Sequence, residues 1–123
     1  PRQGLQVAAW WAALGLAGAS MGPSHTLSRL LGARFGIPHG ITSGVLLPVV
    51  VEQLARDEPT RLLAVLAPLQ QTDPRDLAPA MRRRFSQLGL PTTLRAAGLT
   101  PEQLPEYLAT IPGQWRDPVV AAY

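Results

Sequence analysis

The 123-residue sequence contains no cysteine, lysine or asparagine, and no acidic residue occurs before Glu52. The absence of cysteine excludes a disulfide framework and cysteine-based zinc fingers, and it is consistent with a cytoplasmic protein. Charged residues make up only 15% of the chain, whereas hydrophobic residues make up 46%. This composition is too apolar for a disordered protein and leaves little polar surface for one that stands alone.

The basic residues argue against a nucleic-acid-binding protein. All eleven are arginines and the formal net charge is only +3. The one basic run, Arg82–Arg84, falls in a segment with helical spacing and has no interleaved aromatic residues. Such a run is usually the solvated face of a helix, so we expect no nucleic-acid partner.

The N-terminal part of the chain is strongly apolar, with no charged side chain in residues 3–28. This stretch could be a buried core helix, a membrane span or a secretory signal. Its limited length and its Ala and Gly content favour the buried helix over the span, and Arg2 alone is a thin basic region for a secretory signal. We therefore expect no membrane partner. Trp10 and Trp11 are then expected in the core or at a domain interface, and Trp115 is expected to be partly exposed.

Helical spacing and capping signals recur along the chain, and no sustained strand-type alternation or Gly-rich phosphate loop is present. One helix is expected to begin near Ser20 or Ser24 and to end near Gly36, because Pro38 disfavours the helical conformation of the preceding residue. Later amphipathic segments carry potential capping residues at Thr60, Asp73, Thr92 or Thr93, and Thr100. The sequence predicts an all-α bundle of six or seven helices in a single domain, residues 1–123.

Both histidines of the chain, His25 and His39, flank the break at Gly36 and Pro38. In one unbroken helix they would be roughly 21 Å apart and could not share an ion. The break allows the chain to fold back, with His39 near the start of the next helix. Spacing alone therefore permits a shared metal ion, but it equally permits two ordinary core or surface histidines.

Residues 22–52, GPSHTLSRLLGARFGIPHGITSGVLLPVVVE, resemble the histidine-bearing signature of the iron-containing alcohol dehydrogenases and the related maleylacetate reductases. That signature reads approximately G-x-x-H-x-x-x-H-x-L-G-x-x-x-x-x-P-H-G, followed by an apolar run ending in L-L-P. The late segment LGLPTTLRAAGLTPEQLPEYLATI is also similar to the family's. The resemblance spans most of the chain and implies the C-terminal helical domain of such a protein.

The resemblance implies a metal centre shared with residues outside this chain. In the family one Asp and three His hold Fe²⁺, or sometimes Zn²⁺, and two of those histidines match His25 and His39. The other two ligands belong to an upstream helix that is absent here, as is the N-terminal domain that binds NAD(P). That missing domain, in the same or a separate chain, is the implied partner, and without it the chain alone is expected to be inactive.

Arg29 departs from the family pattern, which often has a second histidine at this position. An arginine stays protonated and is unsuited to a proton relay. It could instead bind a substrate carboxylate, as in an oxo-acid, or pair with an acid of the missing domain. Both roles stay open.

The implied activity is hydride transfer between NAD(P)H and a small carbonyl or alcohol substrate, with the metal ion as a Lewis acid. The alternative is a non-catalytic helical interaction module derived from the same domain. Under either hypothesis, an exposed domain interface could also make the chain a homo-oligomer.

Overall fold

A computed structural model describes residues 2–17 and 20–123 of the chain. Within these residues it contains seven α-helices, three short 3-10 helices (η) and no strand, which confirms the predicted all-α fold. The elements in chain order are α1 (Arg2–Ala17), α2 (Pro23–Phe35), α3 (His39–Asp57), η1 (Pro59–Leu62), α4 (Leu63–Leu66), η2 (Ala67–Leu69), α5 (Pro74–Gln87), α6 (Gln103–Thr110), η3 (Gly113–Trp115) and α7 (Arg116–Ala121).

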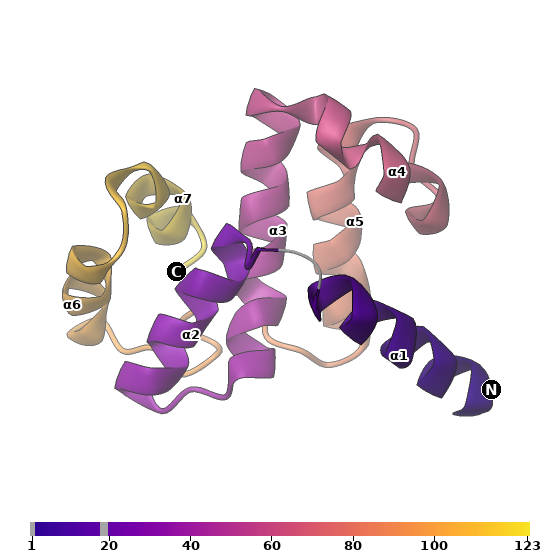
Figure 1. Ribbon diagram of the computed structural model, residues 1–123. Coiled ribbons are helices and arrows are strands. Elements are labelled where there is room, and N and C mark those ends of the chain that lie inside the picture. The colour runs from indigo at the N-terminus through magenta and orange to yellow at the C-terminus, as the bar shows by residue number, and fades with distance from the viewer. Residues whose placement is uncertain (1, 18–19) are drawn as a thin grey trace.

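Helix α3 is the centre of the bundle, with α5 on one side and α2, α6 and α7 on the other (Figure 1). It is apolar around most of its circumference from Val45 to Val51, as expected of a helix covered on several sides. Its residues contribute to two hydrophobic cores. The larger core contains Leu27, Leu31, Ile37, Val45, Leu46, Val50, Leu94, Leu99, Tyr107, Ile111, Trp115 and Val119. The smaller core contains Val51, Ala55, Leu62, Leu77 and Ala78.

Local signals explain where the helices begin and end. Asp73 caps α5, because its carboxylate accepts a hydrogen bond from the Arg75 backbone N–H at 2.8 Å, and Pro74 occupies the first helical position. Gly36 ends α2 in the left-handed conformation, as predicted. The prediction that Ser20 or Ser24 caps α2 is wrong. The cap is Gly22 with Pro23 after it, and Ser24 already lies in the first turn.

The C-terminal part of the chain is fastened to α2 by α6. The fully buried Tyr107 donates a hydrogen bond from its hydroxyl to the Leu27 carbonyl oxygen at 3.2 Å, and its ring packs edge-on against Phe35. Arg34 and Glu106 form an ion pair between the same two helices. Trp115 is buried in the larger core, so the prediction that it is partly exposed is wrong.

Helix α1 runs away from the other helices toward the N-terminus (Figure 1). The prediction that it is a buried core helix is wrong for this chain, because Trp10 and Trp11 are 60% and 64% exposed. The physical reason is that α2, α5 and α7 pack on α3 and α6 packs on α2, whereas residues 2–15 of α1 are all exposed. Within the described residues, no helix is long and apolar enough to cross a membrane.

Candidate metal centre

Each of the two histidines lies in the first turn of one of two consecutive helices. His25 lies in the first turn of α2 and His39 is the first residue of α3. Their imidazole rings meet edge to face, with the ring centroids 4.8 Å apart. The chain therefore folds back over the break at Gly36 and Pro38, and two rings that an unbroken helix would hold roughly 21 Å apart come into contact.

Small and hydroxyl-bearing residues allow α2 and α3 to cross closely beside the histidines. Thr42 lies one turn after His39, and its hydroxyl lies 3.3 Å from the carbonyl oxygen of Ser28, which is one turn after His25. Thr42 and Ser28 are both fully buried. Gly32 lies one turn further along α2, where a Cβ atom would be 3.3 Å from the backbone oxygen of Ile37. The close packing of α2 on α3 at these small residues therefore brings the two imidazoles together.

The histidine pair faces the outside of the bundle. His25 is partly buried and His39 is exposed. The nearest polar group with a defined contact is the Ser43 hydroxyl, whose oxygen lies 3.4 Å from Nε2 of His39. The first acidic residue of the chain, Glu52, lies thirteen residues further along α3, which corresponds to about 20 Å of helix. It therefore cannot complete a site at the histidines.

Arg29 lies on the same side of α2 as His25, because the two residues are four apart. Its side chain is exposed. In the described part of the chain it makes no hydrogen bond or ion pair with another side chain. The guanidinium is thus available to a ligand or to a surface that covers the histidine pair, and both predicted roles stay predictions.

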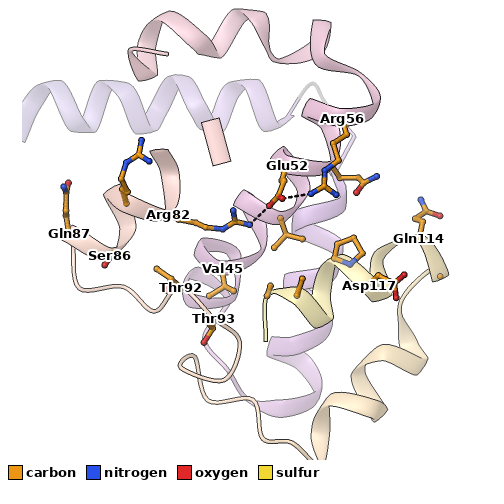
Figure 2. Close-up of a pocket in the computed structure, with 17 residues that line it drawn as sticks. Val45, Glu52, Arg56, Arg82, Ser86, Gln87, Thr92, Thr93, Gln114 and Asp117 are labelled. Atoms are coloured by element: carbon orange, nitrogen blue, oxygen red, sulfur yellow. Dashed lines mark hydrogen bonds and ion pairs between the residues drawn. The ribbon is translucent and has the colours of Figure 1, made fainter. Parts of the chain in front are cut away.

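A separate groove of about 1180 Å³ lies between α3, α5 and the C-terminal segment from Gly113 to Ala122 (Figure 2). Neither histidine lines it. On one wall Glu52 accepts hydrogen bonds from Arg82 at 2.7 Å and from Arg56 at 2.5 Å. The hydrogen bond from Arg82, followed by the charges of both arginines, lowers the pKa of the Glu52 carboxyl against the opposing effect of partial burial.

The ion pair between Arg82 and Glu52 in this groove was not predicted from the sequence. Arg82–Arg84 was expected to form a solvated face, which holds for Arg83 and Arg84, but Arg82 is half-buried and paired with Glu52. Glu52 and Arg56 are four residues apart on one helix, so their contact was available from spacing. Glu52 and Arg82 are thirty residues apart, and their contact depends on how α5 packs on α3.

Comparison with known proteins identifies the family. The model of one family, described as "Fe-containing alcohol dehydrogenase family, C-terminal", matches residues 1–111. The chain belongs to this family. As a family member it is 32% identical over 97 residues to the bifunctional aldehyde-alcohol dehydrogenase AdhE of Escherichia coli K12, and equally to that of E. coli O157:H7. No solved structure matches the chain.

The match to these relatives covers a small part of their length. The 97 residues are 79% of this chain but only 10% of each AdhE protein. The Fe-containing alcohol dehydrogenase region described here therefore corresponds to about a tenth of the curated relatives that it matches.

The family description specifies iron, and the residues of this chain fit such an ion in part. Two imidazoles in contact suit a shared ion, because His nitrogen is a common ligand of iron and zinc and the rings can turn toward one point. Protein sites for these metals usually have at least three protein ligands. Among residues 2–17 and 20–123, no group of three or more His, Cys, Asp or Glu side chains could hold a metal ion. The pair is therefore at most a partial site.

Proposed function

We propose that this chain is the metal-binding helical domain of an NAD(P)-dependent, Fe-containing alcohol dehydrogenase, in which His25 and His39 are two of the metal ligands. The observation that supports the proposal is the edge-to-face contact of these imidazoles, at 4.8 Å, in a chain that belongs to this family. They are the only histidines of the chain. Their meeting is a consequence of the α2–α3 crossing and needs no other partner.

In the proposed enzyme, a bound iron or zinc ion would supply Lewis-acid chemistry to a hydride transfer between a nicotinamide and a carbonyl carbon. The residues of this chain would hold the two imidazole ligands in place. The Thr42–Ser28 contact fixes the two helix starts from which the imidazoles project. The Thr42 hydroxyl oxygen also lies 3.0 Å from the His39 carbonyl oxygen, so the same side chain contacts the first turn of α3 and the helix that crosses it. A site held by rigid helices keeps its ligands in register.

Arg29 would act on the substrate side of the site. Its guanidinium can form two parallel hydrogen bonds with a carboxylate, which favours an oxo-acid over a simple aldehyde as substrate. NAD(P) and the remaining metal ligands would come from an N-terminal domain outside these 123 residues. The chain on its own would then be inactive, because the remaining ligands and the NAD(P) site would lie outside it.

The proposal is tested by the metal content of the intact protein, purified from its source and measured for iron and zinc. His39→Ala and His25→Ala are each expected to lose the metal, because an ion with one ligand removed is held by too few protein groups. The control is Thr26→Ala, which alters an exposed side chain next to His25 and should retain the metal.

Unchanged metal content in both histidine variants would reject the assignment. It would favour the alternative that the chain is a non-catalytic helical module of the same ancestry. The substrate role of Arg29 has a separate readout. Arg29→Gln should raise KM for a keto-acid substrate while the metal content stays normal, and it should leave KM for an uncharged aldehyde unchanged.

A further inference from the structure

The groove between α3, α5 and the C-terminal segment lies apart from the histidine pair, and the proposed function does not use it. Its volume of about 1180 Å³ can hold a small metabolite, since ligand sites usually measure roughly 300 to 1000 Å³. The buried side chains of Val45 and Val49 lie on its α3 side. Hydroxyl, amide and charged side chains supply much of the remaining lining, and none of the described lining residues is aromatic. The groove therefore suits a polar ligand that has no flat ring system to stack.

One wall of the groove has an excess of positive charge. Glu52 accepts a hydrogen bond from Arg56 through one carboxylate oxygen and from Arg82 through the other, so one carboxylate holds two guanidiniums together (Figure 2). Each guanidinium has five N–H donors, and Glu52 engages only some of them. Arg83 also lines the groove, and within residues 2–17 and 20–123 it forms no ion pair. Three guanidiniums against one carboxylate leave an anionic ligand with unused donors on this wall.

Neutral hydrogen-bonding groups lie beside these arginines. Ser86 is four residues after Arg82 on α5, and Gln87 is four residues after Arg83, so the members of each pair share a side of the helix. Asp117, the second carboxylate of the lining, belongs to α7 on the other side of the groove (Figure 2). Negative charge on a ligand is therefore favoured at the α5 wall and disfavoured at the α7 wall.

This distribution of charge favours one kind of anion. A phosphate monoester has three peripheral oxygens and close to two negative charges at pH 7, so it can accept hydrogen bonds from several donors of the α5 wall at once. Its other end can be uncharged, as the α7 wall requires. Hydroxyl groups at that end can donate to a carboxylate, whereas a second anionic group there would be repelled.

We infer that the groove is a binding site for a small phosphate monoester that carries several hydroxyl groups, such as a sugar phosphate. The phosphate binds at the α5 wall, where Arg82, Arg83 and Ser86 are the donors. The hydroxyl groups bind on the opposite side, where the Asp117 carboxylate and the Gln114 side-chain carbonyl accept hydrogen bonds. The inference is independent of the proposed function, since neither histidine lines the groove.

The test is isothermal titration calorimetry of the intact protein with glucose 6-phosphate, at about 0.15 M salt so that long-range charge effects are screened. Saturable binding is expected, and unphosphorylated glucose should not bind. Arg83→Gln should weaken the binding about tenfold, which corresponds to about 1.4 kcal/mol. The matched control is Arg84→Gln, which removes the same charge from the next position of α5, does not line the groove and should bind as wild type does. Both arginines are exposed, so neither change disturbs a core.

A second variant tests the orientation of the ligand. Asp117→Asn should weaken the binding of glucose 6-phosphate, because an amide oxygen is a weaker acceptor than a carboxylate. It should not weaken the binding of inorganic phosphate, which has no hydroxyl-bearing end. Succinate, a dicarboxylate, should bind wild type more weakly than glucose 6-phosphate does, and Asp117→Asn should narrow that difference.

Four results would overturn the inference. They are no saturable binding of glucose 6-phosphate, an unchanged affinity in Arg83→Gln, an equal loss in Arg83→Gln and Arg84→Gln, and succinate binding as tightly as glucose 6-phosphate. An unchanged affinity in Arg83→Gln would mean that the ligand binds elsewhere on the intact protein. His39→Ala should leave the affinity for glucose 6-phosphate unchanged whatever its effect on metal content, so failure of this inference is distinguishable from failure of the proposed function.

Discussion

Tyr107 offers a quantitative test of how α6 is held on α2. Its side chain is fully buried, and its hydroxyl donates a hydrogen bond to the Leu27 carbonyl oxygen at 3.2 Å. In Tyr107→Phe the ring stays and the hydrogen bond is lost, so no large cavity forms. A hydrogen bond of this kind contributes about 1 kcal/mol to the free energy of unfolding. At pH 7 we expect the variant to be less stable by that amount, with a Tm lower by about 3 to 5 °C.

At alkaline pH, the difference in stability between wild type and Tyr107→Phe should vanish or slightly reverse. Burial raises the pKa of the Tyr107 hydroxyl above its ordinary value of 10.0. In the unfolded chain the hydroxyl ionises above that value, whereas in the folded chain it keeps its proton. The stability that goes with the raised pKa is therefore fully present below pH 10 and is lost as the pH rises toward the folded value. At pH 11 the loss amounts to about 1.4 kcal/mol, which offsets the hydrogen bond.

The assay is urea unfolding of wild type and Tyr107→Phe at pH 7 and pH 11, monitored by the fluorescence of the buried Trp115. All other titrating groups are common to both proteins, so their effects cancel in the difference between the two free energies. We expect a gap of about 1 kcal/mol at pH 7 and none, or a slight reversal, at pH 11. A gap of the same size at both values would refute the argument that the buried hydroxyl resists ionisation.

Two further variants test the acidic residue of the groove and the break between the histidines. Glu52→Gln should destabilise the protein by less than about 1 kcal/mol at pH 7, because Glu52 and Arg82 are both partly exposed. Because the pKa of Glu52 is lowered, its contribution to stability is present above the ordinary value of 4.5 and is lost as the pH falls below that value. The urea midpoints of variant and wild type should therefore converge near pH 3. A difference that stays constant with pH would contradict this. Gly36→Ala places a side chain at φ 70°, where no atom clashes but the backbone is strained, and should cost about 1 to 2 kcal/mol in urea unfolding. The matched control, Gly44→Ala inside α3, should instead gain about 0.5 to 1 kcal/mol, and equal effects of the two changes would show that φ is not the cause.

The parts of the site that were predicted from sequence are those set by local rules. Gly36 and Pro38, with one residue between them, are the signals that end one helix and start the next, so the turn and the position of His39 followed from three or four residues. The contact between the imidazoles required more. It depends on the crossing of α2 and α3 at Ser28 and Thr42, whose small and hydroxyl side chains carry no periodic signal that distinguishes a crossing from an ordinary buried position.

The parts that were not predicted depend on contacts between distant segments. Arg82 was expected in solvent because a run of like charges is usually the solvated face of a helix, yet the packing of α5 on α3 places it beside Glu52. Trp115 was expected near the surface because it lies close to the end of the sequence. Its burial depends on α7 and η3 packing against the larger core, and that arrangement is fixed by side chains more than sixty residues earlier.

The error about α1 has a different origin. Hydrophobicity measures the free energy gained when a side chain leaves water, and it does not specify the surface that covers the side chain. The apolar face of α3 is covered by its own neighbours, whereas Trp10 and Trp11 of α1 are 60% and 64% exposed. Similar apolar composition therefore predicts a buried helix in both cases, and only the packing of the neighbouring helices decides whether the helix is covered.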